Sequence, residues 1–269
     1  MGSNARTMKR LRTGFVVAMA VLLGGQAGAQ SELGRELELL EGQRSNVEHS
    51  ETRVRVPAMY AIKELALATE HSPVKMKALS LLEGPVGSAS DHIRLPAIYA
   101  IVEVANSTED ADVKLKALQS LAEPFASEQL VARNVATDGV NLIMGHVDKT
   151  QASAVTLMTT ALNLLLRAAD SGNNGARMPA INAVWNAVAG CGVDRVYSLA
   201  LDVLQRPIES RSMIGGLEVR FMAIEAIERI GVETKTLEVK EKAIRLLGGV
   251  PSSDESRAQA ATKRIYASM

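Results

Sequence analysis

Apolar residues recur at helical spacing in many short segments of this chain. In one of them, Ala58, Ala61, Ile62 and Leu65 stand at positions i, i+3, i+4 and i+7, which places them on one stripe of an α-helix. Runs of Val, Ile and Thr with alternating polarity, the pattern of a half-buried strand, are missing. The pattern therefore predicts an all-α protein.

The helical pattern repeats at a fixed interval. Residues 55–66 return with few changes as residues 94–105, and residues 74–79 return as 113–118, each after 39 residues. A period of about 40 residues is typical of helical arrays, in which each unit buries its apolar face only by stacking on its neighbours. The first segment predicts an A helix and the second a B helix of one helix pair.

Further copies extend the array to five predicted repeats within residues 51–250. The A motif returns at 177–184 and 219–227, and a degenerate copy at 133–140 has Gly139 where the others have Ala. The B motif returns at 239–247, with weaker copies at 161–165 and 196–201. Residues 30–50 and 251–269 are predicted to form capping helices.

Proline and arginine hold fixed places in the A motif. Pro57, Pro96 and Pro179 stand near the predicted helix starts, where proline is tolerated because no amide there needs a partner within the helix. The arginine two residues before each proline is expected to reach an acidic group or a helix-end carbonyl of the next unit.

The A motif resembles the HEAT repeat family, in particular its short bacterial subtype. The resemblance rests on Asp91, Ile93 and Arg94 followed by Ala97 and Ile101, with Glu218, Val219, Arg220, Ala223 and Ile227 as a second match. It covers roughly residues 50–250, and it implies an α-solenoid of antiparallel helix pairs with a curved surface that holds partners. Such a motif specifies fold well and function hardly at all.

The first 29 residues have the composition of a secretory signal peptide. A basic start at Lys9, Arg10 and Arg12 precedes an uninterrupted apolar run from Phe15 to Leu23, and Ala27-Gly28-Ala29 follows as a cleavage site. Cleavage near Ala29 would place the protein in the periplasm or outside the cell. The alternative is an N-terminal anchor helix, although the apolar run is shorter than the roughly 20 residues that span a bilayer.

The charge of the chain limits which partners it can bind, and its cysteine content bears on the compartment it can occupy. The chain has 30 basic and 30 acidic residues, and four of the basic ones lie in residues 1–29, which contain no acidic residue. The remainder is mildly acidic, which disfavours nucleic-acid binding because that requires a basic surface. Cys191 is the single cysteine, so an oxidising compartment would be tolerated without an internal disulfide.

Catalytic and cofactor motifs are missing. The four histidines show no zinc-binding spacing, and no phosphate-binding loop or nucleophile elbow occurs. The sequence therefore predicts a protein that is not an enzyme and needs no cofactor. The resemblance leaves one enzymatic alternative, since some HEAT-like proteins are lyases that act on bilin chromophores.

Two columns of the A helices are candidate partner-binding positions. One column holds Tyr60, Tyr99, Asp138, Asn182 and Glu225, and the column three residues later holds Lys63, Val102, Asn141, Trp185 and Glu228. Both are mostly polar and are expected to face outward. Exposed aromatic residues are favoured interface anchors, so Tyr60, Tyr99, Val102 and Trp185 are candidates; the alternative is that the rings pack against the neighbouring repeat.

The B helices carry a lysine row that is a second candidate. Lys75, Lys114 and Lys240 each have a second lysine two residues later, and B helices are expected to line the concave face. The row could bind an acidic peptide, a polysaccharide or a lipid headgroup, or it could be a solvated face. Met158, Thr160, Tyr197 and Leu199 interrupt it, and this interruption could instead mark an apolar binding patch.

Together these features predict an exported scaffold for protein–protein interaction in the cell envelope, with no nucleic-acid partner and membrane association only through envelope complexes. An accessory or inhibitory subunit that docks on a secreted or outer-membrane complex is the alternative.

Overall fold

The computed structural model describes residues 32–209 and 216–269, and every regular element in these two ranges is helical. The predicted signal peptide, residues 1–29, lies outside the described residues. The A helices are α4 (Thr52–Leu67), α6 (Asp91–Asn106), α9 (Leu130–Gly145), α11 (Asn174–Val188) and α13 (Gly216–Glu233). The B helices are α5 (Ser72–Val86), α7 (Ala111–Ser120) with its continuation α8 (Ala122–Ala126), α10 (Ala152–Ala169), α12 (Asp194–Ile208) and α14 (Leu237–Gly248).

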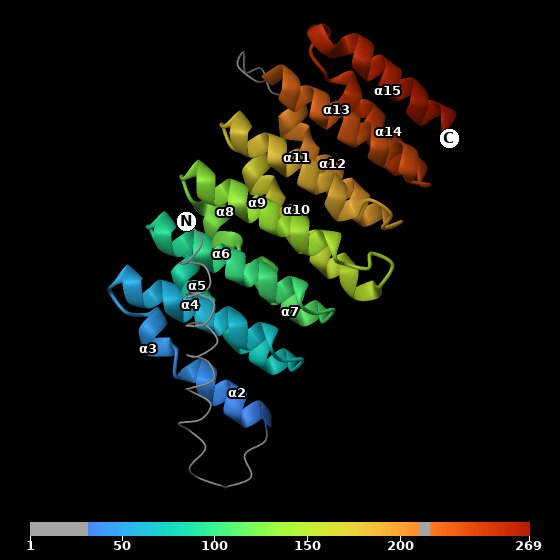
Figure 1. The fold of residues 1–269 in the computed structure, drawn as a ribbon. Helices are drawn as coiled ribbons and strands as arrows, with labels where there is room; N and C mark the ends of the chain where they lie inside the picture. The colour runs from blue at the N-terminus through green and yellow to red at the C-terminus, as the bar shows by residue number, and fades with distance from the viewer. Residues whose placement is uncertain (1–31, 210–215) are drawn as a thin grey trace, which may run out of the picture.

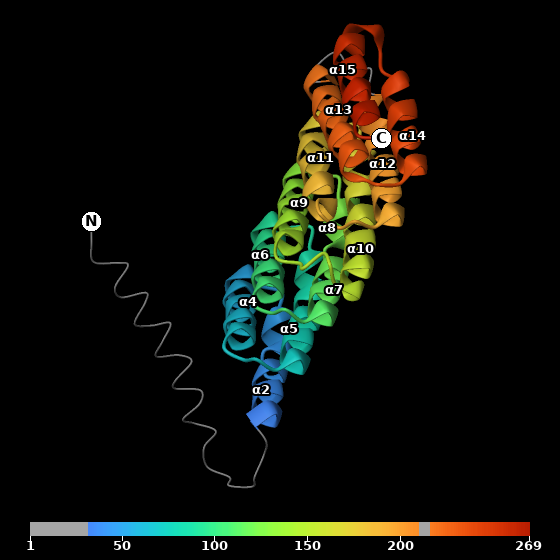
Figure 2. The ribbon, with the colours of Figure 1, turned by 90° about the vertical axis from the view of Figure 1, so that its right-hand side faces the viewer.

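The helices form two parallel rows. Each A helix packs on the A helices before and after it, and each B helix packs on its B neighbours, so that the five pairs stack into one elongated array (Figure 1). Turned by 90°, the A row and the B row lie side by side along the whole stack (Figure 2). The predicted α-solenoid of five helix pairs is confirmed for the described part of the chain.

The ends of the array are closed by different elements. At the N-terminal end, α2 (Glu32–Glu41) packs on α5 and extends the B row, while the short α3 (Arg44–Val47) packs on α4. At the C-terminal end, the turn η1 (Ser252–Asp254) leads into α15 (Glu255–Ala267), which packs on α13 and extends the A row. The segment predicted as one N-terminal capping helix thus contains two helices.

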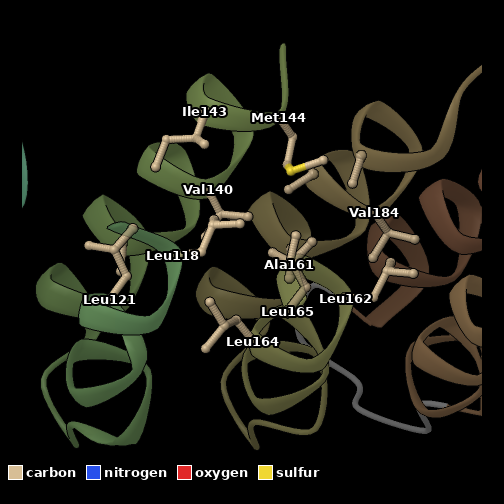
Figure 3. Close-up of a cluster of buried hydrophobic side chains, with 14 of the residues drawn as sticks. Leu118, Leu121, Val140, Ile143, Met144, Ala161, Leu162, Leu164, Leu165 and Val184 are labelled. Carbon is tan, nitrogen blue, oxygen red and sulfur yellow. The ribbon is translucent and has the colours of Figure 1, made fainter. Parts of the chain in front are cut away.

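The core runs along the seam between the two rows. Figure 3 shows its middle part, where Leu118 of α7, Val140 of α9, Leu162 and Leu165 of α10 and Val184 of α11 meet, all of them inaccessible to solvent. Burying a side chain of this size stabilises the fold by roughly 1.5–3 kcal/mol. Because each contact joins consecutive units, the stability of the array is distributed along its length.

The prolines lie deeper in their helices than predicted. Pro57, Pro96 and Pro179 are each the sixth residue of an A helix, since α4, α6 and α11 begin a turn earlier than the motif indicated. Each proline removes the hydrogen bond to the carbonyl four residues earlier. Those carbonyls belong to the exposed Arg53, His92 and Gly175, where water can replace the lost donor.

The motif arginines connect neighbouring units, as expected, but in both directions along the array. Arg94 donates to Ser127 and Gln129, Arg133 donates to Ser171 and Arg220 pairs with Asp254, all in the following unit. Arg55 and Arg177 instead donate to carbonyls at the ends of the preceding helices, at Val47 and Ala169.

Helix α10 is the one described helix that is long and apolar enough to cross a membrane. Half of its residues are buried within the protein, and it packs between α7 and α12 in the B row. These contacts are those of a core helix.

Candidate partner-binding surfaces

The first lysines of the B motif lie in the interior, so the expectation of an exposed row at these positions is wrong. Lys75, Lys114 and Lys240 are 1%, 2% and 4% exposed. Each reaches the end of the following A-row helix: Lys75 donates to the main-chain oxygen of Ser107 at 2.8 Å, Lys114 to that of His146 at 2.5 Å, and Lys240 to that of Ser268 at 2.6 Å. These ammonium groups stabilise the negative ends of α6, α9 and α15.

Two units without this lysine use other groups in its place. In α12, Tyr197 donates its hydroxyl proton to Glu233 near the end of α13, and burial together with this bond raises the pKa of Tyr197 well above its usual range. In α10 the position holds the buried Met158, and Lys149, in the turn before α10, donates instead to the main-chain oxygen of Asn186 in α11. Side chains from the preceding units thus reach the ends of α6, α9, α11, α13 and α15.

The second lysines form a ladder of ion pairs along the B row. Lys77 pairs with Glu41 of α2 at 2.6 Å, Lys116 with Glu83 of α5 at 2.5 Å, and Lys242 with Asp202 of α12 at 2.7 Å. Thr160 and Leu199 replace this lysine in α10 and α12, so the ladder is interrupted there.

A groove of about 600 Å³ lies next to this interruption. We call it the B-row groove; it crosses α10, α12 and α14. It is lined by Thr159, Asn163, Asp194, Arg195, Ser198, Leu199, Asp202, Thr236, Glu238, Val239, Lys242 and Arg245.

Small side chains account for the groove. The residue after the first lysine is Met76 in α5 and Leu115 in α7, and both side chains pack against the core. The equivalent residues in α10 and α12 are Thr159 and Ser198, which fill less space and line the groove. The apolar patch considered at this part of the B row is instead a mostly polar groove, in which Leu199 and Val239 are the apolar lining residues.

The charges of the groove divide into paired and unpaired groups. Lys242 is held by Asp202 and by both oxygen atoms of Ser198, and Asp194 accepts a hydrogen bond from Thr234. No ion pair within 32–209 and 216–269 involves Arg195 or Arg245. These two guanidinium groups are exposed at the groove, where they can form bidentate hydrogen bonds with carboxylate groups of a partner.

The first A-helix column faces outward, as predicted. Tyr60 is 43% exposed and Tyr99 is 55% exposed, and Asp138, Asn182 and Glu225 are exposed at the equivalent positions.

The second A-helix column faces the next A helix and not the solvent, which corrects the prediction for Lys63, Val102 and Trp185. We call these contacts the outer seam. Its members are the pairs Lys63–Glu103 at 2.8 Å, Val102–Gly139, Asn141–Asn186 at 2.9 Å, Trp185–Arg229 and Glu228–Arg264.

Val102 is the most deeply placed of these candidates, with 6% of its surface exposed. A Cβ atom at Gly139 would lie 2.7 Å from a methyl carbon of Val102, so the absence of a side chain at Gly139 makes room for Val102. The glycine that made this repeat look degenerate is therefore the packing partner of Val102.

Trp185 is half-buried and packs against the core. The guanidinium of Arg229 lies 5.6 Å from the centre of its ring, at cation–π distance. Much of the ring is thus already occupied by contacts within the protein.

The described residues hold no candidate metal centre, and their one cysteine is buried. No group of three or more His, Cys, Asp and Glu residues among them could hold a metal ion. Cys191 is buried, and burial raises the pKa of its thiol, which disfavours the thiolate form that acts as a nucleophile.

Comparisons with known proteins place the chain by its fold alone. No family model and no curated protein matches the sequence. Among similar solved structures, one of the computationally designed armadillo repeat proteins for modular peptide recognition has a TM-score of 0.54 and 19% identity. The match covers 87% of this chain and 99% of the designed chain. A designed armadillo repeat protein in complex with peptide (KR)4 has a TM-score of 0.53 and 18% identity, covering 88% and 99%. An engineered protein has a TM-score of 0.54 and 14% identity, covering 85% and 97%. The chain shares the all-helical repeat architecture of these proteins.

Proposed function

We propose that this chain is a non-catalytic scaffold that binds a partner protein in the B-row groove. The observation that carries the proposal is the groove itself: where the ion-pair ladder of the B row is interrupted, a groove presents Arg195 and Arg245, which form no ion pair within 32–209 and 216–269. The fold supports it, because stacked helix pairs offer long surfaces whose shape does not depend on closing around a ligand. The similar solved structures include one designed for modular peptide recognition.

The groove can be tested by site-specific photocrosslinking. A photoreactive amino acid at Asn163, which lines the groove on α10, is expected to form one dominant adduct with a protein from the cell of origin. Asn163 and Gln119 occupy equivalent positions of their B helices, and Gln119 is exposed outside the groove. The probe at Gln119 is therefore a matched control. Replacing Arg195 and Arg245 by alanine should reduce the adduct at Asn163.

Two outcomes would contradict the groove as the binding site. One is equal crosslinking from Asn163 and Gln119. The other is an adduct at Asn163 that persists unchanged when Arg195 and Arg245 are both alanine.

We further propose that the scaffold is a HEAT-like repeat protein that is exported and works in the periplasm or outside the cell. The basic start, the apolar run to Leu23 and the small residues at 27–29 support this address. In a Gram-negative host, the periplasmic fraction is expected to contain a chain whose first residue by mass spectrometry is Gln30. An uncleaved chain in the membrane fraction would indicate an anchor, and an uncleaved chain in the cytoplasm would overturn export.

A further inference from the structure

We propose that the A row binds a lysine or arginine side chain of a partner protein between α6 and α9, with the cation over the ring of Tyr99 and beside the carboxylate of Asp138. This site lies on the A row and is separate from the B-row groove, so it does not depend on the function proposed for that groove.

Elsewhere in the A row, aromatic rings lie next to cations of the chain itself. The ammonium of Lys63 lies 5.5 Å from the ring centre of Tyr60 and pairs with Glu103 of the next helix. The guanidinium of Arg229 lies 5.6 Å from the ring of Trp185 and pairs with Glu225. At three places along the row, including Phe221 with Arg257 at 4.0 Å, an aromatic ring is therefore covered by a cation of the chain itself.

Tyr99 differs from these rings because no cation of the described residues lies over it. It occupies the position of Tyr60 one repeat later, but Val102 stands where Lys63 would supply the cation. No cation–π contact or hydrogen bond of Tyr99 occurs within 32–209 and 216–269, and its side chain is the more exposed of the two tyrosines. The face of this ring is open to a cation from outside.

On the next A helix, α9, the position equivalent to Tyr99 holds an acidic residue, Asp138. Helices α6 and α9 pack side by side, and Tyr99 and Asp138 occupy equivalent positions on them, 39 residues apart, with both side chains exposed. Asp138 has no hydrogen bond or ion pair in the described ranges. Although it is exposed, neighbouring protein displaces part of the water around its carboxylate and raises its pKa. A cation would compensate this loss of hydration.

The surrounding surface suits a long basic side chain. Polar or charged pairs bridge the outer seam at Lys63–Glu103, Asn141–Asn186 and Glu228–Arg264. Between α6 and α9 the seam is instead apolar, and Leu142, one turn after Asp138, is 50% exposed. The methylene groups of lysine or arginine pack on such a surface while the charged end reaches a polar partner.

The test measures binding of a fluorescein-labelled hexa-arginine peptide to the full chain by fluorescence anisotropy at low ionic strength. Tyr99→Ala and Asp138→Asn are each expected to weaken binding at least about threefold, and the double variant about tenfold, from the usual strengths of exposed cation–π and ion-pair contacts. Binding of a hexaglutamate peptide, whose carboxylates suit the arginines of the B-row groove, should be unchanged in Tyr99→Ala.

Matched variants distinguish binding at Tyr99 and Asp138 from general attraction of the basic peptide to acidic groups of the chain. Tyr60→Ala removes the equivalent ring one repeat earlier, which Lys63 already covers, and should leave peptide binding unchanged. Val102→Lys supplies an internal cation beside Tyr99 and should weaken peptide binding as Asp138→Asn does. Equal losses for Tyr60→Ala and Tyr99→Ala, or unchanged binding in Asp138→Asn, would overturn the proposal. Circular dichroism confirms that each variant is folded.

Discussion

Replacing Asp254 by alanine is expected to lower the free energy of unfolding by about 3–5 kcal/mol. Asp254 precedes α15, and its side chain is inaccessible to solvent while it pairs with Arg220 of α13, which is 8% exposed. Without the carboxylate, the guanidinium of Arg220 would keep its charge in the interior and lose the ion pair with Asp254. Urea unfolding followed by circular dichroism measures the loss.

A second ion pair, which joins α13 and α15 directly, is the control. Arg264 of α15 pairs with Glu228 of α13, and the arginine side chain is 57% exposed. Because water and salt screen this pair, Arg264→Ala is expected to lower the free energy of unfolding far less than Asp254→Ala does. Similar losses in the two variants would show that burial does not set the strength of the Arg220–Asp254 pair. A lower urea dependence in Asp254→Ala would indicate that α15 separates before the rest of the array unfolds.

Replacing Lys75 by methionine is expected to lower the free energy of unfolding by about 1.5–3 kcal/mol. Methionine preserves most of the buried stem but removes the ammonium that donates to the main-chain oxygen and the hydroxyl of Ser107, at 2.8 Å and 2.9 Å. The end of α6 then loses a charged donor and a favourable interaction with the helix dipole. Thermal and urea unfolding of the variant measure the effect.

Lys77→Met provides the comparison from two residues further along α5. Lys77 is 32% exposed and pairs with Glu41, whose side chain is half exposed, so the loss is expected to stay below about 1 kcal/mol. If the two variants lost the same stability, Lys75 would contribute as a surface charge and not as a helix-end ligand.

The period of the sequence predicted the fold because each motif carries a complete stripe of core residues. Ala58 and Ile62, and Ala97 and Ile101 one repeat later, are all buried, since the spacing of apolar residues along a helix determines which side faces the core. Even the weak copies in α10 and α12 kept this spacing and form regular helices in the B row. Helix starts were less well predicted, as the sixth-position prolines show.

The candidate sites were harder to predict because a polar column can face a neighbouring unit as well as water. Lys75 and Lys77 stand two residues apart in one helix, yet the buried Lys75 contacts the end of α6 and Lys77 contacts an exposed glutamate. The sequence does not specify how far each unit is displaced against the next, and this displacement decides the partner of a long side chain. The position of Val102 depended on Gly139, a residue whose contribution is the absence of a side chain.

The lysine that donates to the end of the following A helix has a consequence for how such a chain can gain repeats by duplication. The donor lies in one unit and the acceptor in the following one: Lys75 serves α6, and Lys114 serves α9. A gene duplication that copies one 39-residue unit therefore copies a donor for its successor and places its own A helix after an existing donor. An inserted unit therefore needs no compensating mutation at either connection, which explains how the similar copies at 55–79 and 94–118 can stand in tandem.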